Sequence, residues 1–169
     1  MAALYYDLYY KEYITKSLPL QMKEEILTFT VEHLDECANL AVEVFNGELP
    51  NQHWTRETAR VRLQEIFNTS GFVGLVCRSW EMQGFVVGIC EQWENTLRFE
   101  LKTICVRSDR QGHGIGTNLL QQLVNTLKSM NVNSIYLLTS KDGLAEAFYT
   151  KNGFQRSPRM IFMSHQLIQ

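Results

Sequence analysis

The chain carries the stretch Gln111-Gly112-His113-Gly114-Ile115-Gly116-Thr117 between an apolar run and an amphipathic segment. Glycines let a backbone turn sharply and leave room for a ligand to approach it. The start of a helix offers unpaired N–H groups and partial positive charge, both of which suit a phosphate. We therefore expect the backbone amides of residues 112–117 to bind a phosphate-bearing ligand. The alternative is a structural turn whose glycines only cap and pack.

The residues on either side predict a strand, a glycine loop and a helix, in that order. Residues 97–106 alternate apolar and charged side chains and then become mostly apolar, as in a strand that runs into an interior. Downstream, apolar residues recur at helical spacing: Ile115, Leu119, Leu120, Leu123, Val124, Leu127 and Met130. Thr117 replaces the third glycine of a dinucleotide fingerprint, and the Gly-Lys-Ser/Thr of a P-loop is missing. These two misfits disfavour a nucleotide-binding oxidoreductase.

At these residues the chain resembles the GCN5-related N-acetyltransferase (GNAT) superfamily. Residues 111–116 match its acyl-CoA signature, Gln/Arg-x-x-Gly-x-Gly/Ala. Residues 145–154 are similar to a second element of the family, Ala-x-x-Phe-Tyr-x-x-x-Gly-Phe. The resemblance is strongest over residues 97–156 and extends back to about residue 25. One departure is Asp142, which stands where the family often has an Asn that contacts CoA.

The resemblance implies an α/β fold of the acyl-CoA N-acyltransferase type. This fold has a central mixed, mostly antiparallel sheet of about seven strands, splayed between strands 4 and 5 and flanked by about four helices. The element order predicted from the residues, β-α-α-β-β-β-α-β-α-β-β, agrees with it. The strands are predicted over residues 25–30, 72–78, 85–91, 97–106 and 134–139, with two more in the tail over 154–168, separated by a bend at Pro158.

The domain is expected to span residues 25–169, and the tyrosine-rich residues 1–24 are expected to form an N-terminal extension that packs on it. Thr55 is predicted to cap the second helix, and a short helix is predicted over residues 144–151.

The activity that the resemblance implies is direct transfer of an acetyl group from acetyl-CoA to a primary amine of a small molecule or peptide. A lysine-like amine has a pKa of about 10.4, so a base must take its proton. Glu100 is the first candidate base, because it lies on the strand that leads to the glycine loop, and Glu91 on the neighbouring strand is the second. The alternative for Glu100 is an ordinary cross-strand partner of a Lys or Arg. Glu94, in the turn between the strands, is expected to be solvated.

Tyr149 is the general acid that the resemblance implies, since a phenol can hydrogen-bond the sulfur and return a proton to the thiolate. The alternative is a half-buried tyrosine on a helix face. Backbone N–H groups near residues 104–106 are expected to meet the oxyanion, with a bulge in that strand aiming a donor inward. We interpret Cys105 as a packing residue, because no His or Asn is placed to activate it.

The residues expected to contact the cofactor comprise that strand, the glycine loop and two positions near the second motif. They are Ile104, Cys105, Val106, Gln111, Gly112, His113, Gly114, Ile115, Gly116, Thr117, Asp142 and Phe148. A competing hypothesis is a non-catalytic module that binds acyl-CoA as a sensor or regulator. Both hypotheses predict CoA binding, and only the enzyme predicts release of a thiol when an amine is present.

The composition narrows the class of protein further. A length of 169 residues suits one domain with a core, and a net charge of −2 argues against a nucleic-acid binder. The four cysteines lack CxxC spacing and the four histidines are scattered, so we expect reduced thiols and no metal site. No apolar run is long enough to span a bilayer and no secretion signal is seen, so we expect a cytoplasmic protein without membrane contact.

The acceptor cannot be read from the residues. Trp54, Trp93 and Phe162 are candidates to line a pocket for an apolar acceptor, or else to fill the core. The tail strands are candidates to join two copies of the chain as a homodimer.

Overall fold

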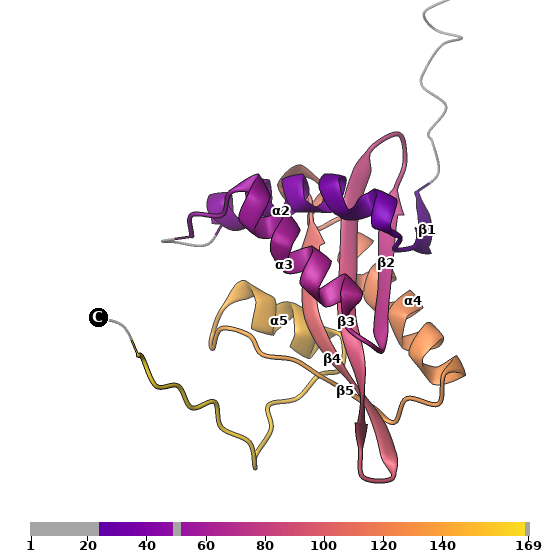
Figure 1. The fold of residues 1–169 in the computed structure, drawn as a ribbon, viewed down its shortest axis with the longest axis vertical. Coiled ribbons are helices and arrows are strands. Elements are labelled where there is room, and N and C mark those ends of the chain that lie inside the picture. Colours follow the sequence, from indigo (N-terminus) through magenta and orange to yellow (C-terminus); the bar gives the residue numbers. More distant parts are fainter. Residues whose placement is uncertain (1–23, 49–51, 168–169) are drawn as a thin grey trace, which may run out of the picture. The chain divides into compact units, whose positions relative to one another are not determined.

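The computed structural model describes residues 24–48 and 52–167 (Figure 1). The chain divides into two units, Met1–Tyr136 and Leu137–Gln169, and each is described by itself. The extension expected over residues 1–24 lies outside the described residues, apart from Glu24.

The first unit is built on a five-stranded sheet with the strand order β1-β2-β3-β4-β5. Its strands are β1 (Glu25–Thr28), β2 (Phe72–Arg78), β3 (Met82–Trp93), β4 (Thr96–Val106) and β5 (Ser134–Tyr136). The first four strands pair antiparallel, and β5 lies parallel to β4. A parallel neighbour requires a crossover connection, which a helix between β4 and β5 supplies. The predicted mixed, mostly antiparallel sheet is therefore confirmed.

The β4–β5 edge opens after a short ladder. Arg98 pairs with Ser134, Phe99 with Ile135 and Glu100 with Tyr136, and β4 then runs on to Val106 beyond the last pair. The part of β4 beyond this ladder is where the splay between strands 4 and 5 is expected. The strand predicted over residues 134–139 is shorter in the structure, where β5 ends at Tyr136.

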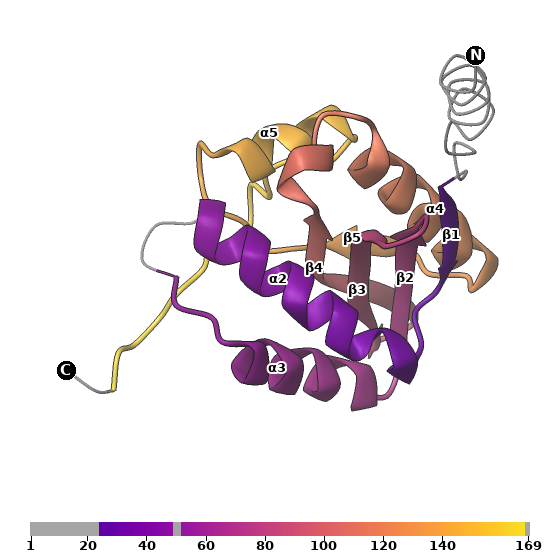
Figure 2. The same ribbon diagram turned by 90° about the horizontal axis from the view of Figure 1, so that it is seen from above.

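Helices cover both faces of this sheet. They are α2 (Leu34–Glu48), α3 (Arg56–Asn68) and α4 (Ile115–Ser129), with single turns of 3₁₀ helix at η1 (Val31–His33) and η2 (Ser108–Arg110). Figure 2 shows α2 and α3 on one face and α4 on the opposite face. The predicted cap of α3 is confirmed, because the backbone N–H of Thr58 donates to Oγ1 of Thr55 at 3.1 Å.

Two apolar layers hold the helices to the sheet. Under α2 and α3, the ring of Phe29 lies 5.6–6.4 Å from those of three other phenylalanines: Phe67, Phe72 and Phe85. On the other face, α4 buries five of the seven residues in the predicted stripe: Ile115, Leu119, Leu120, Leu123 and Leu127. Val124 is half-buried, and Met130 follows the end of the helix and is exposed. Each such side chain contributes about 1.5–3 kcal/mol by leaving water, so packing fixes the position of α4.

The second unit contains one helix, α5 (Leu144–Lys151), which has the predicted bounds. The two strands predicted in the tail are wrong over the described residues 154–167, where the backbone bends at Pro158 as expected but enters no ladder. The consecutive apolar side chains of residues 160–163 are all at least 74% exposed. Apolar residues favour a strand only where a neighbouring strand accepts their hydrogen bonds and a layer covers their side chains.

Candidate active site

The glycine loop joins the end of β4 to the start of α4. Gly112 and Gly114 have φ values of +76° and +89°, in the left-handed region that disfavours other residues. A β-carbon built on either glycine would meet no heavy atom within 4 Å. The two glycines are therefore required by backbone conformation, and the space beside them is open to a ligand.

The N-terminus of α4 faces this space with unused donors. The first hydrogen bond of the helix runs from the N–H of Asn118 to the carbonyl of Gly114 at 2.9 Å, so the N–H groups of Ile115, Gly116 and Thr117 precede it. Within residues 24–48 and 52–167, no side chain caps this end, and the first turn carries no acidic residue. The buried side chain of Ile115 anchors the turn. Open glycines, free donors and the helix dipole together fit a diphosphate.

Two side chains brace the loop from its N-terminal side. The Gln111 amide donates to the carbonyl of Val106 at 3.2 Å, and Nδ1 of His113 lies 2.9 Å from the carbonyl of Gln111. These contacts tie the loop to the end of β4, so its shape is set before any ligand arrives.

The bulge expected in this strand is present in β4. Val87 pairs with Thr103 and Gly88 with Leu101, which leaves Lys102 as the extra residue. Residues 104–106, where the oxyanion donors are expected, pair regularly with β3, so the bulge precedes them. In an antiparallel ladder about half of the N–H groups of β4 point away from β3. Beyond the end of the β5 ladder, these groups lie along the splayed edge.

The side chains of residues 104–106 point to different faces of the sheet. Cys105 is buried among the residues under α2, and its thiol lies 3.9 Å from the carbonyl of Leu40. Val106 points toward α4, since a β-carbon on Gly84 would lie 3.2 Å from both Val106 and Leu119. The buried position of the Cys105 side chain agrees with the packing role that the sequence predicts.

The two candidate bases come together on adjacent strands. Ile89 pairs with Glu100 and Glu91 pairs with Arg98, so both carboxylates lie on the same face of β3 and β4. Nζ of Lys102 lies 2.6 Å from Oε2 of Glu100. The ion-pair alternative considered for Glu100 is therefore present, with a lysine of its own strand as the partner.

Tyr136 on β5 joins these carboxylates and was missed in the sequence. Its hydroxyl donates to Oε2 of Glu91 at 2.9 Å and lies 3.4 Å from Oε2 of Glu100. Partial desolvation, with the two carboxylates, raises the pKa of Tyr136 above its usual range. The residue stands in a predicted strand, but only the register of β5 against β4 shows what it faces.

In the second unit, Tyr149 is buried with its ring edge-on to Phe148 and Phe154, at centroid distances of 5.3 and 5.5 Å. Burial raises the pKa of Tyr149 to about 12, so the phenol is a proton donor at neutral pH. Asp142 has a φ of +58°, and its carboxylate lies 2.6 Å from Nη2 of Arg156. The side chain at this departure from the family pattern thus already has a cationic partner.

A model of the acetyltransferase (GNAT) domain family matches residues 67–156, which make up 90 of the 169 residues. This match includes β2, β3, β4, the glycine loop, α4, β5 and α5. The chain belongs to the GNAT acetyltransferase family. It is thereby an acyl-CoA-dependent N-acetyltransferase by class, and the expected acyl-CoA N-acyltransferase fold is confirmed.

Solved structures share this GNAT fold at low identity. A possible acetyltransferase from Clostridium difficile 630 has a TM-score of 0.73 and 14% identity, over 86% of this chain and 99% of that one. A glucosamine-6-phosphate N-acetyltransferase from Arabidopsis thaliana has a TM-score of 0.62 and 18% identity, over 86% and 99%. An aminoglycoside acetyltransferase from an uncultured soil metagenomic sample, in complex with sisomicin, has a TM-score of 0.69 and 15% identity, over 86% and 97%. No curated protein sequence matches the chain.

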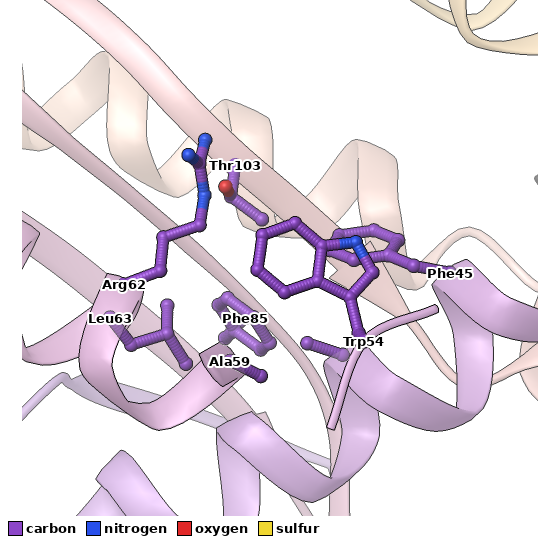
Figure 3. Close-up of a pocket in the computed structure, with 8 residues that line it drawn as sticks. Phe45, Trp54, Ala59, Arg62, Leu63, Phe85 and Thr103 are labelled. Atoms are coloured by element: carbon purple, nitrogen blue, oxygen red, sulfur yellow. The ribbon is translucent and has the colours of Figure 1, made fainter. Parts of the chain in front are cut away.

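A small hollow lies between α2, α3 and the sheet of the GNAT domain (Figure 3). It is lined by Ala41, Phe45, Trp54, Ala59, Arg62, Leu63, Phe85 and Thr103. The guanidinium of Arg62 lies 5.8 Å from the centre of the Trp54 ring. The space that a water molecule could occupy is about 10 Å³, which suffices for about one water. The hollow is therefore too small to hold an acceptor as it stands.

The three aromatic residues considered for an acceptor pocket are not all found in this hollow. Trp54 lines it, held by Asn46, whose side chain bonds the N–H and the carbonyl of Trp54 at 2.8 Å each. Trp93 lies instead at the end of the β3–β4 hairpin, under the guanidinium of Arg98 at 4.9 Å. Phe162 belongs to the exposed tail of the second unit.

Among the described residues, no three His, Cys, Asp or Glu side chains are grouped as metal ligands. No helix in the described part of the chain has the length and apolar character needed to cross a bilayer.

Proposed function

We propose that the protein transfers an acetyl group from acetyl-CoA directly to a primary amine of a small molecule or peptide, with a carboxylate base and Tyr149 as the acid. The observation that carries the proposal is the open, uncapped N-terminus of α4 behind Gly112 and Gly114. It offers a diphosphate what it requires, namely several backbone donors, a favourable dipole and no side chain in the way.

Acetyl-CoA supplies an activated thioester when bound. The amides of residues 112–117 would hold its diphosphate, and the outward N–H groups of β4 would pair with its pantetheine arm along the splayed edge. Donors of the same edge are candidates to stabilise the oxyanion. Asp142 and Phe148 are proposed as further contacts to the cofactor.

The acceptor must reach the thioester as a neutral amine. Only about one lysine-like amine in 2,500 is neutral at pH 7, so a nearby carboxylate is needed to take the proton. Glu100 and Glu91 supply two carboxylates on one face of adjacent strands. Tyr149 has a phenol that burial keeps protonated, which suits the return of a proton to the departing thiolate.

Small amines are the acceptor class that we favour. Two of the structural neighbours are a glucosamine-6-phosphate N-acetyltransferase and an aminoglycoside acetyltransferase. The four cysteines are free thiols, which supports a reducing compartment such as the cytoplasm.

The test combines a binding measurement with a turnover measurement. Titration calorimetry with acetyl-CoA should show binding, and free thiol should appear when glucosamine 6-phosphate, sisomicin, spermidine or a lysine peptide is added. A variant lacking both bases, Glu91→Gln with Glu100→Gln, should bind acetyl-CoA and release no thiol. Glu94→Gln is the matched control, since it removes a charge from the same hairpin. Absence of acetyl-CoA binding at millimolar concentration would overturn the proposal.

The same experiment distinguishes a non-catalytic acyl-CoA sensor from an enzyme. It predicts binding of acetyl-CoA with no thiol released above the level without amine, for every amine in the panel.

A further inference from the structure

We infer that Tyr136 is a positioning residue that holds Glu91 as the carboxylate that takes the proton of the acceptor amine. This inference rests on the proposed function and assigns the base that the sequence left open between Glu91 and Glu100. Glu91, Glu100, Lys102 and Tyr136 contact one another through their side chains, and we call this group the carboxylate cluster.

The carboxylate cluster is assembled by three adjacent strands. Glu91 comes from β3, Glu100 from β4 and Tyr136 from β5, and the register places Tyr136 directly beside Glu100. The hydroxyl of Tyr136 has one proton to donate. It donates to Oε2 of Glu91 at 2.9 Å, and Oε2 of Glu100 lies farther away at 3.4 Å. The shorter contact identifies Glu91 as the carboxylate that Tyr136 holds.

Lys102 makes the two carboxylates unequal. Its ammonium lies 2.6 Å from Oε2 of Glu100, and the two side chains are only 30% and 18% exposed. A carboxylate whose charge is already partly balanced by a lysine attracts a second ammonium less strongly. Glu100 therefore serves as the partner of Lys102.

Glu91 is placed to meet an acceptor. Its side chain is exposed, and Arg98, the cation opposite it on β4, has its guanidinium over the ring of Trp93 at 4.9 Å. The neutral hydroxyl of Tyr136 fixes Glu91 without cancelling its charge. An ammonium arriving at this face thus finds an oriented carboxylate that has kept its negative charge.

The phenol of Tyr136 is suited to this role because it remains a donor. Partial desolvation, with the hydrogen bond to Glu91 and the charge of Glu100, raises the pKa of Tyr136 above the usual value of about 10. It therefore keeps its proton throughout the range in which an acetyltransferase is assayed.

The first test measures kcat and KM with the best amine of the panel. Glu91→Gln should lower kcat about a hundredfold, in the range of a general base, and Tyr136→Phe about tenfold. Both should leave the KM for acetyl-CoA unchanged. Glu100→Gln should lower kcat less than Glu91→Gln, and the control Glu94→Gln should match the wild type.

The double variant decides whether Tyr136 acts through Glu91. If it does, adding Tyr136→Phe to Glu91→Gln should cause no further loss of kcat. A role of Tyr136 in folding alone would add its full tenfold loss in either background. If the loss of kcat in the double variant equals the product of the two single losses, the inference is overturned. A larger loss of kcat in Glu100→Gln than in Glu91→Gln would also overturn it.

The second test does not depend on turnover. In protein labelled with ¹³C at the tyrosine ring, the resonance missing from Tyr136→Phe belongs to Tyr136. Its titration should begin well above pH 10 in the wild type and Glu94→Gln, and lower in Glu91→Gln. Titration near pH 10 in the wild type would overturn the cluster. If the wild type releases no thiol with any amine, the proposed function fails, and this inference fails with it. If the wild type does release thiol, and Glu91→Gln and Tyr136→Phe have the same kcat as the wild type, only the inference fails.

Discussion

The carbonyl oxygen of Glu100 lies directly over Gly88, where a β-carbon would approach it to 2.2 Å. The same β-carbon would meet Cζ of Phe99 at 2.4 Å. Gly88 stands opposite the bulge at Lys102, so the close approach of β3 and β4 at this point helps to set where Glu100 is presented.

Gly88→Ala should destabilise the domain by about 3 kcal/mol, because the methyl group meets backbone that cannot move without breaking the β3–β4 ladder. Urea denaturation measures the change. Gly47→Ala is the control: its β-carbon would meet no heavy atom within 4 Å, and α2 should gain up to about 1 kcal/mol from the lost flexibility. Equal stability of the two variants would contradict the close packing at Gly88.

Gly114→Asp should weaken acetyl-CoA binding about tenfold relative to Gly114→Asn. The two side chains have nearly the same shape, and both residues tolerate the left-handed backbone of Gly114 better than others do. Only Asp places a negative charge where a diphosphate is expected, and raised salt should narrow the difference. Titration calorimetry at low and high salt provides the measurement. Equal affinities would move the diphosphate away from the helix start.

The sequence predicts most reliably those elements whose signals are local. The apolar stripe of α4, the Thr55 cap and the bounds of α5 depend on residues three or four apart, and all three are confirmed. The tail strands fail because a strand depends on a partner that the tail itself does not specify. The apolar residues of the tail do not themselves indicate whether another part of the protein covers them.

In the candidate site, too, the features with local signals are predictable and the contacts between strands are not. The glycine loop can be predicted from the sequence, because the backbone turn needs positive φ values and glycines mark the positions that adopt them, Gly112 and Gly114. The link from Tyr136 to Glu91 cannot be read, since these residues are 45 positions apart and meet only through the register of three strands. The position of the bulge cannot be predicted for the same reason. Lys102 is the extra residue only because Thr103 pairs with Val87 and Leu101 pairs with Gly88.

Tyr149→Phe should lower kcat about a hundredfold, the usual size of a general-acid contribution, and leave the dissociation constant of acetyl-CoA within about twofold. The ring that packs against Phe148 and Phe154 is retained, so the fold should survive. Burial raises the pKa of Tyr149 to about 12, so its proton is in place throughout the assay range. The loss should therefore be equal at pH 6.5 and pH 9. Unchanged kcat would remove Tyr149 from the chemistry.

Acid should remove a stabilising contact at the start of α5. Arg156 and the N–H of Asp142 hold the carboxylate of Glu146, and its pKa is lowered to about 2. In the unfolded chain this carboxyl binds its proton near pH 4.3. Its stabilising effect is therefore complete above that pH and is lost as the pH falls toward 2. The difference in unfolding free energy between the wild type and Glu146→Gln should shrink over this range.

The control for this experiment is Glu43→Gln, which removes an exposed carboxylate on α2. Its difference from the wild type should stay constant while that of Glu146→Gln declines. Urea denaturation at pH 6, 4 and 2.5 gives both series. A constant difference for Glu146→Gln would show that Arg156 does not hold this carboxylate in solution. The position of Asp142, which shares Arg156, would then no longer be fixed by this ion pair.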